Sequence, residues 1–546
     1  MSTNPLLDQS MLPYQAPRFD RIKDCHYRPA FDEGVRQKRV EIEAIVNHPA
    51  APDFTNTLLA LEQSGALLSR VTSVFFAMTA AHTNDELQRL DEAFSAELAA
   101  LSNDIYLNSA LFARVDAVWQ QRHSLGLDDE SLRLVDVIHQ RFVLAGAQLA
   151  EEDKARLKVL NTESATLMSQ FNQRLLAASK AGGLAVDDAH CLAGLSPEEM
   201  TVAAEAAREK GLEERWFIPL LNTTQQPALA TLRDRQTREN LFAASWTRAE
   251  KGDAHDTRAI VQRLVEIRRC QAKLLGFPNY AAWKMADQMA KTPQAALSFM
   301  RGIVPPARQR VLNEQAEIQN VIDGEQGGYT VQAWDWMFYA EQVRREKYAL
   351  DEAQLKPYFA LNTVLQEGVF WTANQLFGIT FVERFDIPVY HPDVRVWEIF
   401  DSDGVGMALF YGDFFTRDSK SGGAWMGILS SNPHSMKPGP LYTMYVTIRN
   451  RLMGSLHYCF GTTLLRSSMS LVIRYMVCLP SSAMPRFQVP IRPATLSSFP
   501  PRLMSIGRAI HVCSNATRVM STAVKKCLLI YRKECARRVY LIKVTI

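Results

Sequence analysis

The sequence predicts a mainly α-helical fold with a small β-hairpin region near residues 379–411. Apolar residues recur at helical spacing through most of the first 377 residues, and helix-start motifs precede several of these stripes. Residues typical of β-strands concentrate only after Gly378. The 546 residues are 47% hydrophobic and 22% charged, which is typical of folded globular proteins and excludes wholesale disorder.

Three motifs predict where helices begin. The run Thr83–Glu86 matches a capping box and is followed by apolar residues at helical intervals. Ser196 and Thr292 are each followed by proline, which is favoured at the first helical position, and Gly211 predicts the end of the helix that Ser196 opens. Between residues 151 and 178 a charged border flanks a long apolar stripe, so we expect a long helix there.

Strands are predicted after Gly378. Ile379–Val382, Val394–Phe400 and Val405–Tyr411 are rich in β-branched and aromatic residues. Asp401–Gly404 lies between the last two runs and supplies turn residues, so these runs are expected to form a hairpin. A polar loop, Arg417–Gly423, should follow the hairpin.

The charge of the chain changes abruptly after Gly427. Residues 428–546 contain 17 Lys and Arg but one acidic residue, Glu534, whereas residues 1–427 contain 44 basic and 57 acidic residues. Five of the eight cysteines also lie after Gly427. A basic tail can bind nucleic acid, but these cations are scattered singly, without an aromatic stacking platform or a zinc-finger spacing. The alternative is that this segment was never selected as protein.

Common catalytic motifs are absent from the sequence. It contains no phosphate-binding loop, dinucleotide turn or nucleophile elbow, and no two of its 11 histidines lie four residues apart. His391 with Asp393 forms a possible ligand cluster, but a histidine beside a strand is more often structural, and the same holds for His190-Cys191. The residues alone therefore predict only a soluble, largely helical protein.

The expected location is the cytoplasm. The eight cysteines include no Cys-x-x-Cys pair, so they are expected to be reduced thiols. No uninterrupted apolar run reaches the length of a membrane span, and the first 21 residues lack the pattern of a secretory signal.

Seven phrases in the first 427 residues carry a resemblance to a known family. They are Phe19–Asp24, Leu160–Leu167, Leu275–Ala281, Trp334–Glu341, Leu355–Phe359, Ile387–Glu398, and Phe410–Arg417 with the following Gly422–Met426. In this order they resemble the thimet oligopeptidase family of zinc peptidases. The resemblance implies a two-lobed helical architecture around a deep channel, and the removal of C-terminal dipeptides from short peptides. It divides the chain into a helical region of oligopeptidase type (1–377), a β-hairpin and loop leading to the catalytic region (378–427), and an aberrant tail (428–546).

The family's metal site should lie in the region where this sequence departs from its relatives. In the family, a His-Glu-x-x-His helix supplies two zinc ligands and the general base, and a later Glu completes the site. Codons that can encode Ser468–Val477 regroup, one frame over, to His-Glu-Phe-Gly-His-Thr-Leu-His-Gly. Codons that can encode Ser497–Ile506, shifted by the same one frame, regroup to Glu-Phe-Pro-Ser-Gln-Ile-Asn-Glu-His. The tail is therefore expected to be the catalytic region read in the wrong frame from near Gly427.

In the frame that is encoded, we therefore predict no catalytic, cofactor-binding or metal-binding residue in this chain. Zinc is expected for the family but is predicted not to bind here, because Met469 and Cys478 lack a tetrahedral set of partners. We expect an inactive relative of a zinc peptidyl-dipeptidase, with short peptides as partners and no membrane or nucleic acid. The alternatives are a non-catalytic peptide binder, which could use the strand Val405–Tyr411 as a pairing edge, and a nucleic-acid binder through the basic tail.

Overall fold

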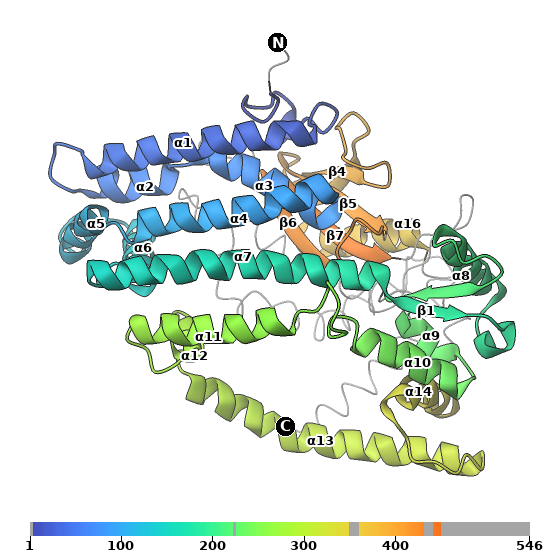
Figure 1. Cartoon of the computed structure of the whole chain (residues 1–546). Coiled ribbons are helices and arrows are strands. Elements are labelled where there is room, and N and C mark those ends of the chain that lie inside the picture. Colours follow the sequence, from blue (N-terminus) through green and yellow to red (C-terminus); the bar gives the residue numbers. More distant parts are fainter. Residues whose placement is uncertain are drawn as a thin grey trace.

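The computed structural model describes residues 4–221, 225–348, 360–415, 417–422, 424–430 and 441–448. Within these residues helices dominate and the strands form two small sheets, which confirms the predicted mainly α class (Figure 1). Met469, Cys478 and the two regions where the alternative frame yields metal-site motifs lie outside the described residues.

Long helices form the N-terminal part of the molecule. Here α1 (Tyr27–Val46) packs against α3 (Ala66–Ala81), and α4 (Asp85–Tyr106) packs against α7 (Glu151–Ala181). Shorter elements complete this part: η3 (Phe54–Leu59), α2 (Ala60–Gln63), α5 (Ser109–Gln121) and α6 (Asp129–Ala145). Burial of aromatic side chains joins these helices, as when the rings of Phe31 and Phe94 stack with centroids 3.8 Å apart.

One of these helical stretches, Phe54–Ala81, is long and apolar enough to cross a membrane. Its side chains Val71, Val74 and Phe75 are buried against neighbouring helices in the N-terminal core. Of the most apolar 18-residue window in this stretch, 44% is buried inside the protein.

Local capping chemistry explains where several helices begin. Ser196 accepts a hydrogen bond from the Glu199 N–H at 3.2 Å, so the predicted cap of α8 (Pro197–Glu209) is confirmed. The Glu199 carboxylate also accepts a hydrogen bond from the Ser196 N–H at 3.0 Å, which completes a capping box. Thr292 caps α13 (Pro293–Gly324), also as predicted.

The predicted start of α4 was wrong by one residue. Asn84, not Thr83, accepts the hydrogen bond from the Leu87 N–H at 2.9 Å. The Thr83 N–H instead donates to the carbonyl oxygen of Ser419 at 2.9 Å, a contact with a distant loop that the local motif could not predict.

A two-stranded sheet lies within the first 377 residues, where no strand was predicted. Its strands β1 (Gly183–Val186) and β2 (Trp216–Pro219) pair antiparallel, and α8 packs against β2. Each strand has four residues, and a helix separates them in the sequence, so no hairpin signal exists.

The middle of the chain returns to helices. The elements are α9 (Gln225–Thr231), α10 (Arg235–Trp246), α11 (Arg258–Leu274), α12 (Tyr280–Met285), α13, α14 (Ala333–Tyr348), α16 (Leu361–Thr363), η6 (Val364–Phe370) and α17 (Trp371–Phe377). Figure 1 shows α13 at the edge of the molecule, with α12 near one end and α14 near the other. Its interior contains Pro305 and Pro306, and the helix bends near its middle, because proline removes a backbone donor (Figure 1).

Five strands form the second sheet, in the order β3-β4-β5-β7-β6. They are β3 (Thr380–Glu383), β4 (Arg395–Phe400), β5 (Gly406–Phe415), β6 (Ala424–Ser430) and β7 (Leu441–Ile448). The predicted hairpin is confirmed, because β4 pairs antiparallel with β5 across the predicted turn. β7 pairs parallel with β5 and antiparallel with β6.

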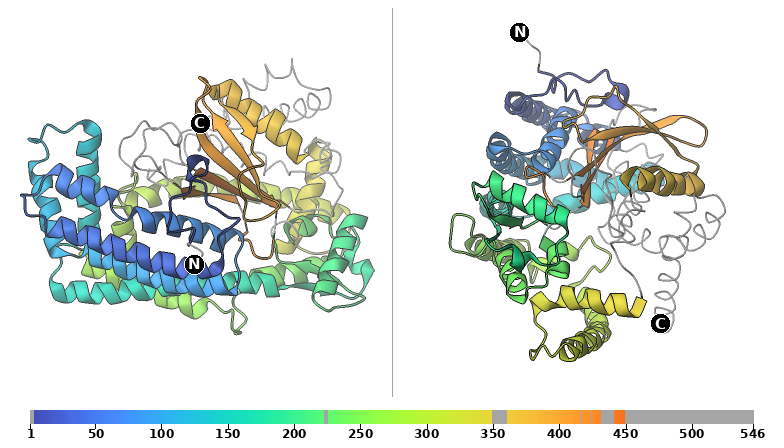
Figure 2. Two further views of the ribbon diagram at one scale, coloured as in Figure 1. Left: turned by 90° about the horizontal axis from the view of Figure 1, so that it is seen from above. Right: turned by 90° about the vertical axis from the view of Figure 1, so that its right-hand side faces the viewer.

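Both faces of this sheet are covered. On one face, Trp397 and Phe410 pack against Phe370 and its neighbours in η6 and α17, and on the other, Leu409 and Tyr411 pack with Ala16 near the N-terminus. Figure 2 shows the sheet held between the short helices after residue 360 and the N-terminal helices. Because successive side chains of a strand point to opposite faces, β5 is apolar on both sides.

The predicted division into three regions stays a prediction. Secondary structure changes at Gly378, whose φ of +76° ends α17 in the left-handed conformation. Strand β7 and the end of β6, however, belong to residues predicted to be aberrant, and they extend the sheet that begins with β3.

Candidate functional site

A buried cluster of charged groups lies where β5, the following loop and the end of α3 meet. We call Asp413, Arg417, Lys420 and Tyr390 the Asp413 cluster. The Asp413 side chain is 0% exposed. Its Oδ1 accepts hydrogen bonds from Arg417 Nη1 and Lys420 Nζ, each at 3.0 Å, and its Oδ2 accepts from the Tyr390 hydroxyl at 2.8 Å. Arg417 Nη2 also donates to Oδ2, so both carboxylate oxygens are fully engaged.

The electrostatics of this cluster favour stable ion pairs over a role in acid–base catalysis. Burial by itself raises the pKa of Asp413, but the Arg417 hydrogen bonds and the Lys420 charge outweigh it and hold the pKa below the usual value. Burial lowers the pKa of Lys420 to about 8, against the opposing charge of Asp413. A carboxylate with a lowered pKa and no free lone pair is a poor general base, so the cluster positions other groups.

The Asp413 cluster fixes the loop to the end of α3. Arg417 Nη2 donates to the carbonyl oxygen of Ala81 at 2.9 Å, and the Ser421 N–H donates to that of Ala80 at 2.9 Å. These groups satisfy carbonyls at a helix C-terminus, where a cation is also favoured by the helix dipole. The loop leads directly into β6, so the cluster sets where β6 begins.

Strand β6 is an edge of the five-stranded sheet among the described residues, whereas β5 is not. The peptide-binding hypothesis placed a pairing edge at Val405–Tyr411, and this placement was wrong for Leu409–Tyr411. Leu409, Phe410 and Tyr411 pair with β4 on one side and with β7 on the other, whereas Gly406 and Ala408 pair with β4 alone among the described residues. The described edges are β3, with four residues, and β6, with seven.

The two histidine motifs that the sequence singled out have ordinary local roles. His391 Nδ1 accepts a hydrogen bond from the Asp393 N–H at 3.2 Å, and its ring meets the His82 ring edge-on with centroids 5.4 Å apart. Burial and the Arg417 charge lower the pKa of His391. His190 lies in the short helix η4 (Ala189–Leu192) beside Cys191, and its N–H donates to Oδ1 of the capping residue Asp188 at 2.9 Å.

The described residues do not fit a zinc site. Zinc needs three or four convergent His, Cys, Asp or Glu ligands, and no such group of three or more occurs in the described part of the chain. The rings of His82 and His391 lie near each other, but His391 Nδ1 is engaged with Asp393 and no group of three ligands forms around the pair in the described part of the chain. Whether the whole chain binds zinc is a separate question, and the expectation that it does not stays a prediction.

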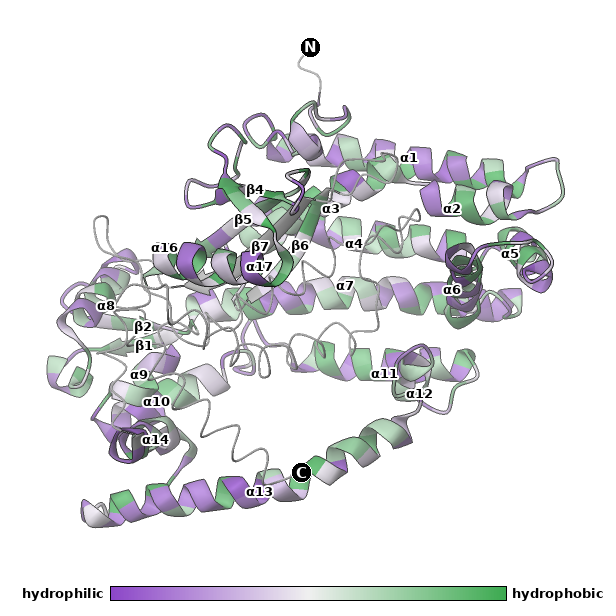
Figure 3. Cartoon of the chain, turned by 180° about the vertical axis from the view of Figure 1, so that it is seen from behind, coloured by the Kyte–Doolittle hydropathy of each residue, from purple (hydrophilic) through white to green (hydrophobic). Residues whose placement is uncertain are grey.

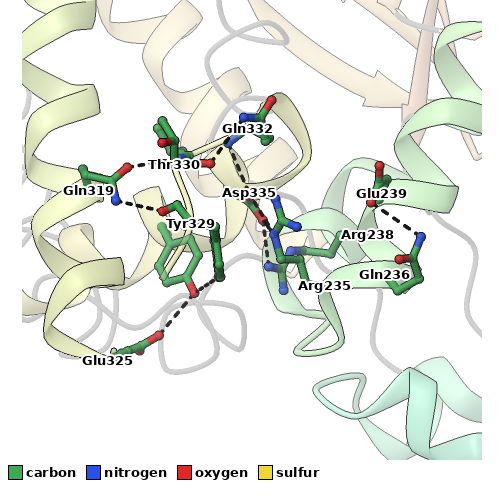
Figure 4. Close-up of polar contacts among 12 residues, drawn as sticks. Arg235, Gln236, Arg238, Glu239, Gln319, Glu325, Tyr329, Thr330, Gln332 and Asp335 are labelled. Carbon is green, nitrogen blue, oxygen red and sulfur yellow. Dashed lines mark hydrogen bonds and ion pairs between the residues drawn. The ribbon is translucent and has the colours of Figure 1, made fainter. Parts of the chain in front are cut away.

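A second buried cluster joins α10 to the loop and helix after α13 (Figure 4). Asp335 is 0% exposed and accepts hydrogen bonds from Arg235 Nε at 3.0 Å and from Arg238 Nη2 at 3.1 Å. The guanidinium of Arg235 lies 4.2 Å from the centroid of the Tyr329 ring. The charges are paired and aromatic rings pack against the arginines. The cluster therefore has a structural role in holding these elements together.

The sequence patterns did not predict that the residues of either cluster would lie together. Asp335, Tyr390, Asp413 and Arg417 all lie in phrases that carry the family resemblance, but nothing local marks them as buried. An acidic residue inside a long apolar strand, such as Asp413 in β5, was the available signal, because an unpaired carboxylate cannot be buried there.

The sequence of this chain is similar to that of a peptidase family. Residues 228–451 match Peptidase family M3, and the chain belongs to this family. Among similar proteins, dipeptidyl carboxypeptidase of Escherichia coli (strain K12) is 78% identical over 424 residues, covering 78% of this chain and 62% of that protein. Oligopeptidase A of Salmonella typhimurium is 28% identical over 428 residues, with the same two coverages. The chain thus spans about three fifths of the length of these relatives.

Proposed function

We propose that this chain descends from a zinc-dependent peptidyl-dipeptidase that removes C-terminal dipeptides from oligopeptides, and that in its present form it is inactive. The similarity to a dipeptidyl carboxypeptidase supports the ancestry. The single observation that carries the inactivity is that no two histidines in the full sequence lie four residues apart. Without that spacing, one helix cannot present two imidazoles to the same zinc ion.

We further propose that the reading frame changes near Gly427. The charge break at this residue and the two family motifs recovered at one offset support this proposal. It is also consistent with coverage of 62% of a relative that is 78% identical. The family match continues to residue 451 and β7 joins the sheet, so the search for the change should extend beyond that point.

The test begins with the gene and ends with activity. The codons around 427–451 are resequenced, and two proteins are purified: the present chain and a chain with the frame restored. Release of dipeptides from a short peptide is measured with and without a chelator. We expect no release from the present chain and chelator-sensitive release from the restored chain. A restored chain with the first histidine of the recovered motif replaced by Ala is the matched control.

Chelator-sensitive dipeptide release by the present chain would refute its proposed inactivity. An inactive restored chain that folds and contains zinc would instead refute the proposed ancestry.

A second candidate function is peptide binding without cleavage. It is favoured by β6, an edge strand of seven residues that the Asp413 cluster anchors at its start. An extended peptide could add to this edge by backbone hydrogen bonds. A labelled short peptide should then bind the present chain, and Gly427→Pro in β6 should weaken binding more than Thr380→Pro in the other edge strand. Equal effects of the two substitutions would exclude β6 as the binding edge.

We also propose that the protein acts in the cytoplasm. The described cysteines, Cys25, Cys191 and Cys270, are all free thiols, which supports a reducing compartment. Fractionation of cells that express the full chain should place it with soluble cytoplasmic markers, and recovery with the membranes would contradict this.

A further inference from the structure

Backbone hydrogen bonds attach the loop after β5 to the end of α3. The Thr83 N–H donates to the carbonyl oxygen of Ser419, and the Ser421 N–H donates to that of Ala80, each at 2.9 Å. We call residues 80–83 and 417–421 together the seam. The chain continues from this loop into β6, which lies beside α3 (Figure 3), so the seam fixes the start of that strand.

Two imidazole rings meet at the seam. His82 ends α3, and its Nδ1 lies 3.3 Å from the hydroxyl oxygen of Ser419. His391, from the segment between β3 and β4, places its ring edge-on against the His82 ring, with centroids 5.4 Å apart. Histidine is the side chain whose ordinary pKa makes its charge change between about pH 5 and 8. The charge at this junction of three distant segments therefore depends on pH within that range.

Charged groups of both signs face the two rings. The positive charge is that of Arg417, which acts on both rings. The carboxylates are those of Asp413, which faces both rings, Asp24, which faces His82, and Asp393, which faces His391. Burial and the Arg417 charge outweigh these carboxylates and lower the pKa of each histidine.

The three carboxylates are already engaged by other groups. Both oxygens of Asp413 accept hydrogen bonds within its own cluster. Asp24 Oδ2 accepts a hydrogen bond at 2.8 Å from the side chain that caps α4. Asp393 Oδ2 lies 3.5 Å from His391 Nδ1 and 3.9 Å from Arg417 Nη1, so this one carboxylate would have to serve two cations if the imidazole were charged.

A hydrogen bond also opposes protonation of His391 in the closed seam. Its Nδ1 accepts from the Asp393 N–H at 3.2 Å, so the neutral ring carries its proton on Nε2. A second proton must go to Nδ1, where it would point at that N–H. The closed arrangement therefore suits the neutral ring better than the charged one.

We propose that the seam is a pH-sensitive attachment: when His82 and His391 are protonated, the loop 417–421 separates from the end of α3 and releases the start of β6. In the open form both rings are in water and bind protons at the ordinary pKa of 6.5. The lowered pKa values belong to the closed form, so the open form holds more protons once the pH falls below about 6.5, and acid favours it. This inference does not depend on whether the chain cleaves peptides.

The test measures amide hydrogen exchange in the full-length chain by mass spectrometry at about pH 7 and about pH 5, with each rate corrected for the intrinsic effect of pH. Peptides that contain the Thr83 and Ser421 amides report on the seam. The Ser69 amide, which donates to the carbonyl oxygen of Gly65, reports on the other end of α3. Protection of the seam amides should fall about threefold or more from pH 7 to pH 5, whereas protection of Ser69 should stay unchanged.

Substitutions of single histidines identify the groups that bind the protons. The double variant His82→Gln with His391→Gln should lose the pH dependence of protection at the seam. His123→Gln, at an exposed position after α5, is the matched control and should keep it. If the double variant fails to fold, His82→Gln alone changes an exposed side chain and should still reduce the fall in protection.

Three results would overturn the inference. One is equal protection of the seam amides at both pH values, and another is an undiminished fall in the double variant or, if that variant does not fold, in His82→Gln. The third is a parallel fall at Ser69, which would show that acid unfolds α3 as a whole and does not open the seam. Since no readout uses peptide cleavage, each result leaves the proposed function to its own test.

Discussion

At the residue scale, Asp413 shows how a buried charge can be tolerated. Two cations and a phenol engage its carboxylate, and the same cations also hold backbone carbonyls at the end of β5 and at the end of α3. Lys420 Nζ donates to the carbonyl oxygens of Asp413 and Phe415, each at 2.9 Å, so its removal would leave buried acceptors as well as a weaker ion cluster. The cluster therefore links the charge state of one side chain to the position of β6.

Replacing Asp413 by Ala should destabilise the protein by about 3–5 kcal/mol, because Lys420 and Arg417 would lose their buried counter-ion. The measurement is the free energy of unfolding in urea. Glu367→Ala, at an exposed position, is the control and should change stability by less than about 0.5 kcal/mol. A loss of stability as small as that of the control would show that the carboxylate is not needed to hold the cluster.

The pH dependence of stability should depend on Lys420. Burial lowers its pKa from 10.5 to about 8 in the folded protein. Between these values the unfolded chain retains a proton that the folded chain has released, so this lysine makes the free energy of unfolding rise with pH. Relative to Lys420→Met, the unmodified chain should gain stability between about pH 8 and about pH 10 in urea titrations. Parallel pH profiles of the two proteins would argue against the lowered pKa, and Lys347→Met at the surface is the control.

At the element scale, the contact between α10 and α14 depends on a charge shared by two arginines. Asp335 lies at the start of α14, and Arg235 and Arg238 lie on α10. Arg238 also donates to the carbonyl oxygens of Leu232 and Arg233, two residues that lie just before α10 in the sequence. The two helices are therefore held by hydrogen bonds that a purely apolar contact would not provide.

Asp335→Ala should cost about 3–5 kcal/mol, because it leaves two arginines without their carboxylate partner. The double variant Arg238→Met with Asp335→Leu should lose less stability than Asp335→Ala, since it removes a buried charge from each side. Thermal unfolding of both variants and of each single substitution measures this coupling. Additive losses in the double variant would mean that the two side chains do not act as a pair.

Sequence patterns predicted elements well where the determining interactions are local. The cap at Ser196, the proline after Thr292 and the turn between β4 and β5 were all predicted correctly, because each signal involves neighbouring residues. The cap at Thr83 was misplaced because its N–H bonds to Ser419, far away in the sequence. Pairing of β5 with β7 was likewise unpredictable, and it made the part of the expected edge from Leu409 onward interior to the sheet.

At the scale of the whole molecule, the sequence predicted the fold class and the family, but not how the site is supported. Periodicity and residue composition are enough to identify a helical protein with a late β region. The Asp413 and Asp335 clusters required knowledge of which distant residues meet. The absence of candidate site residues was predicted from the encoded tail, and it stays a prediction because most of that tail lies outside the described residues.

The hydrogen bonds between the loop after β5 and the end of α3 also imply an order of folding steps during synthesis. Arg417 and Ala81 are 336 residues apart. At ordinary translation rates, the end of α3 leaves the ribosome about 20–70 s before its partner is made. Because β6 packs against α3, this late strand docks on a helix that was synthesised well before it.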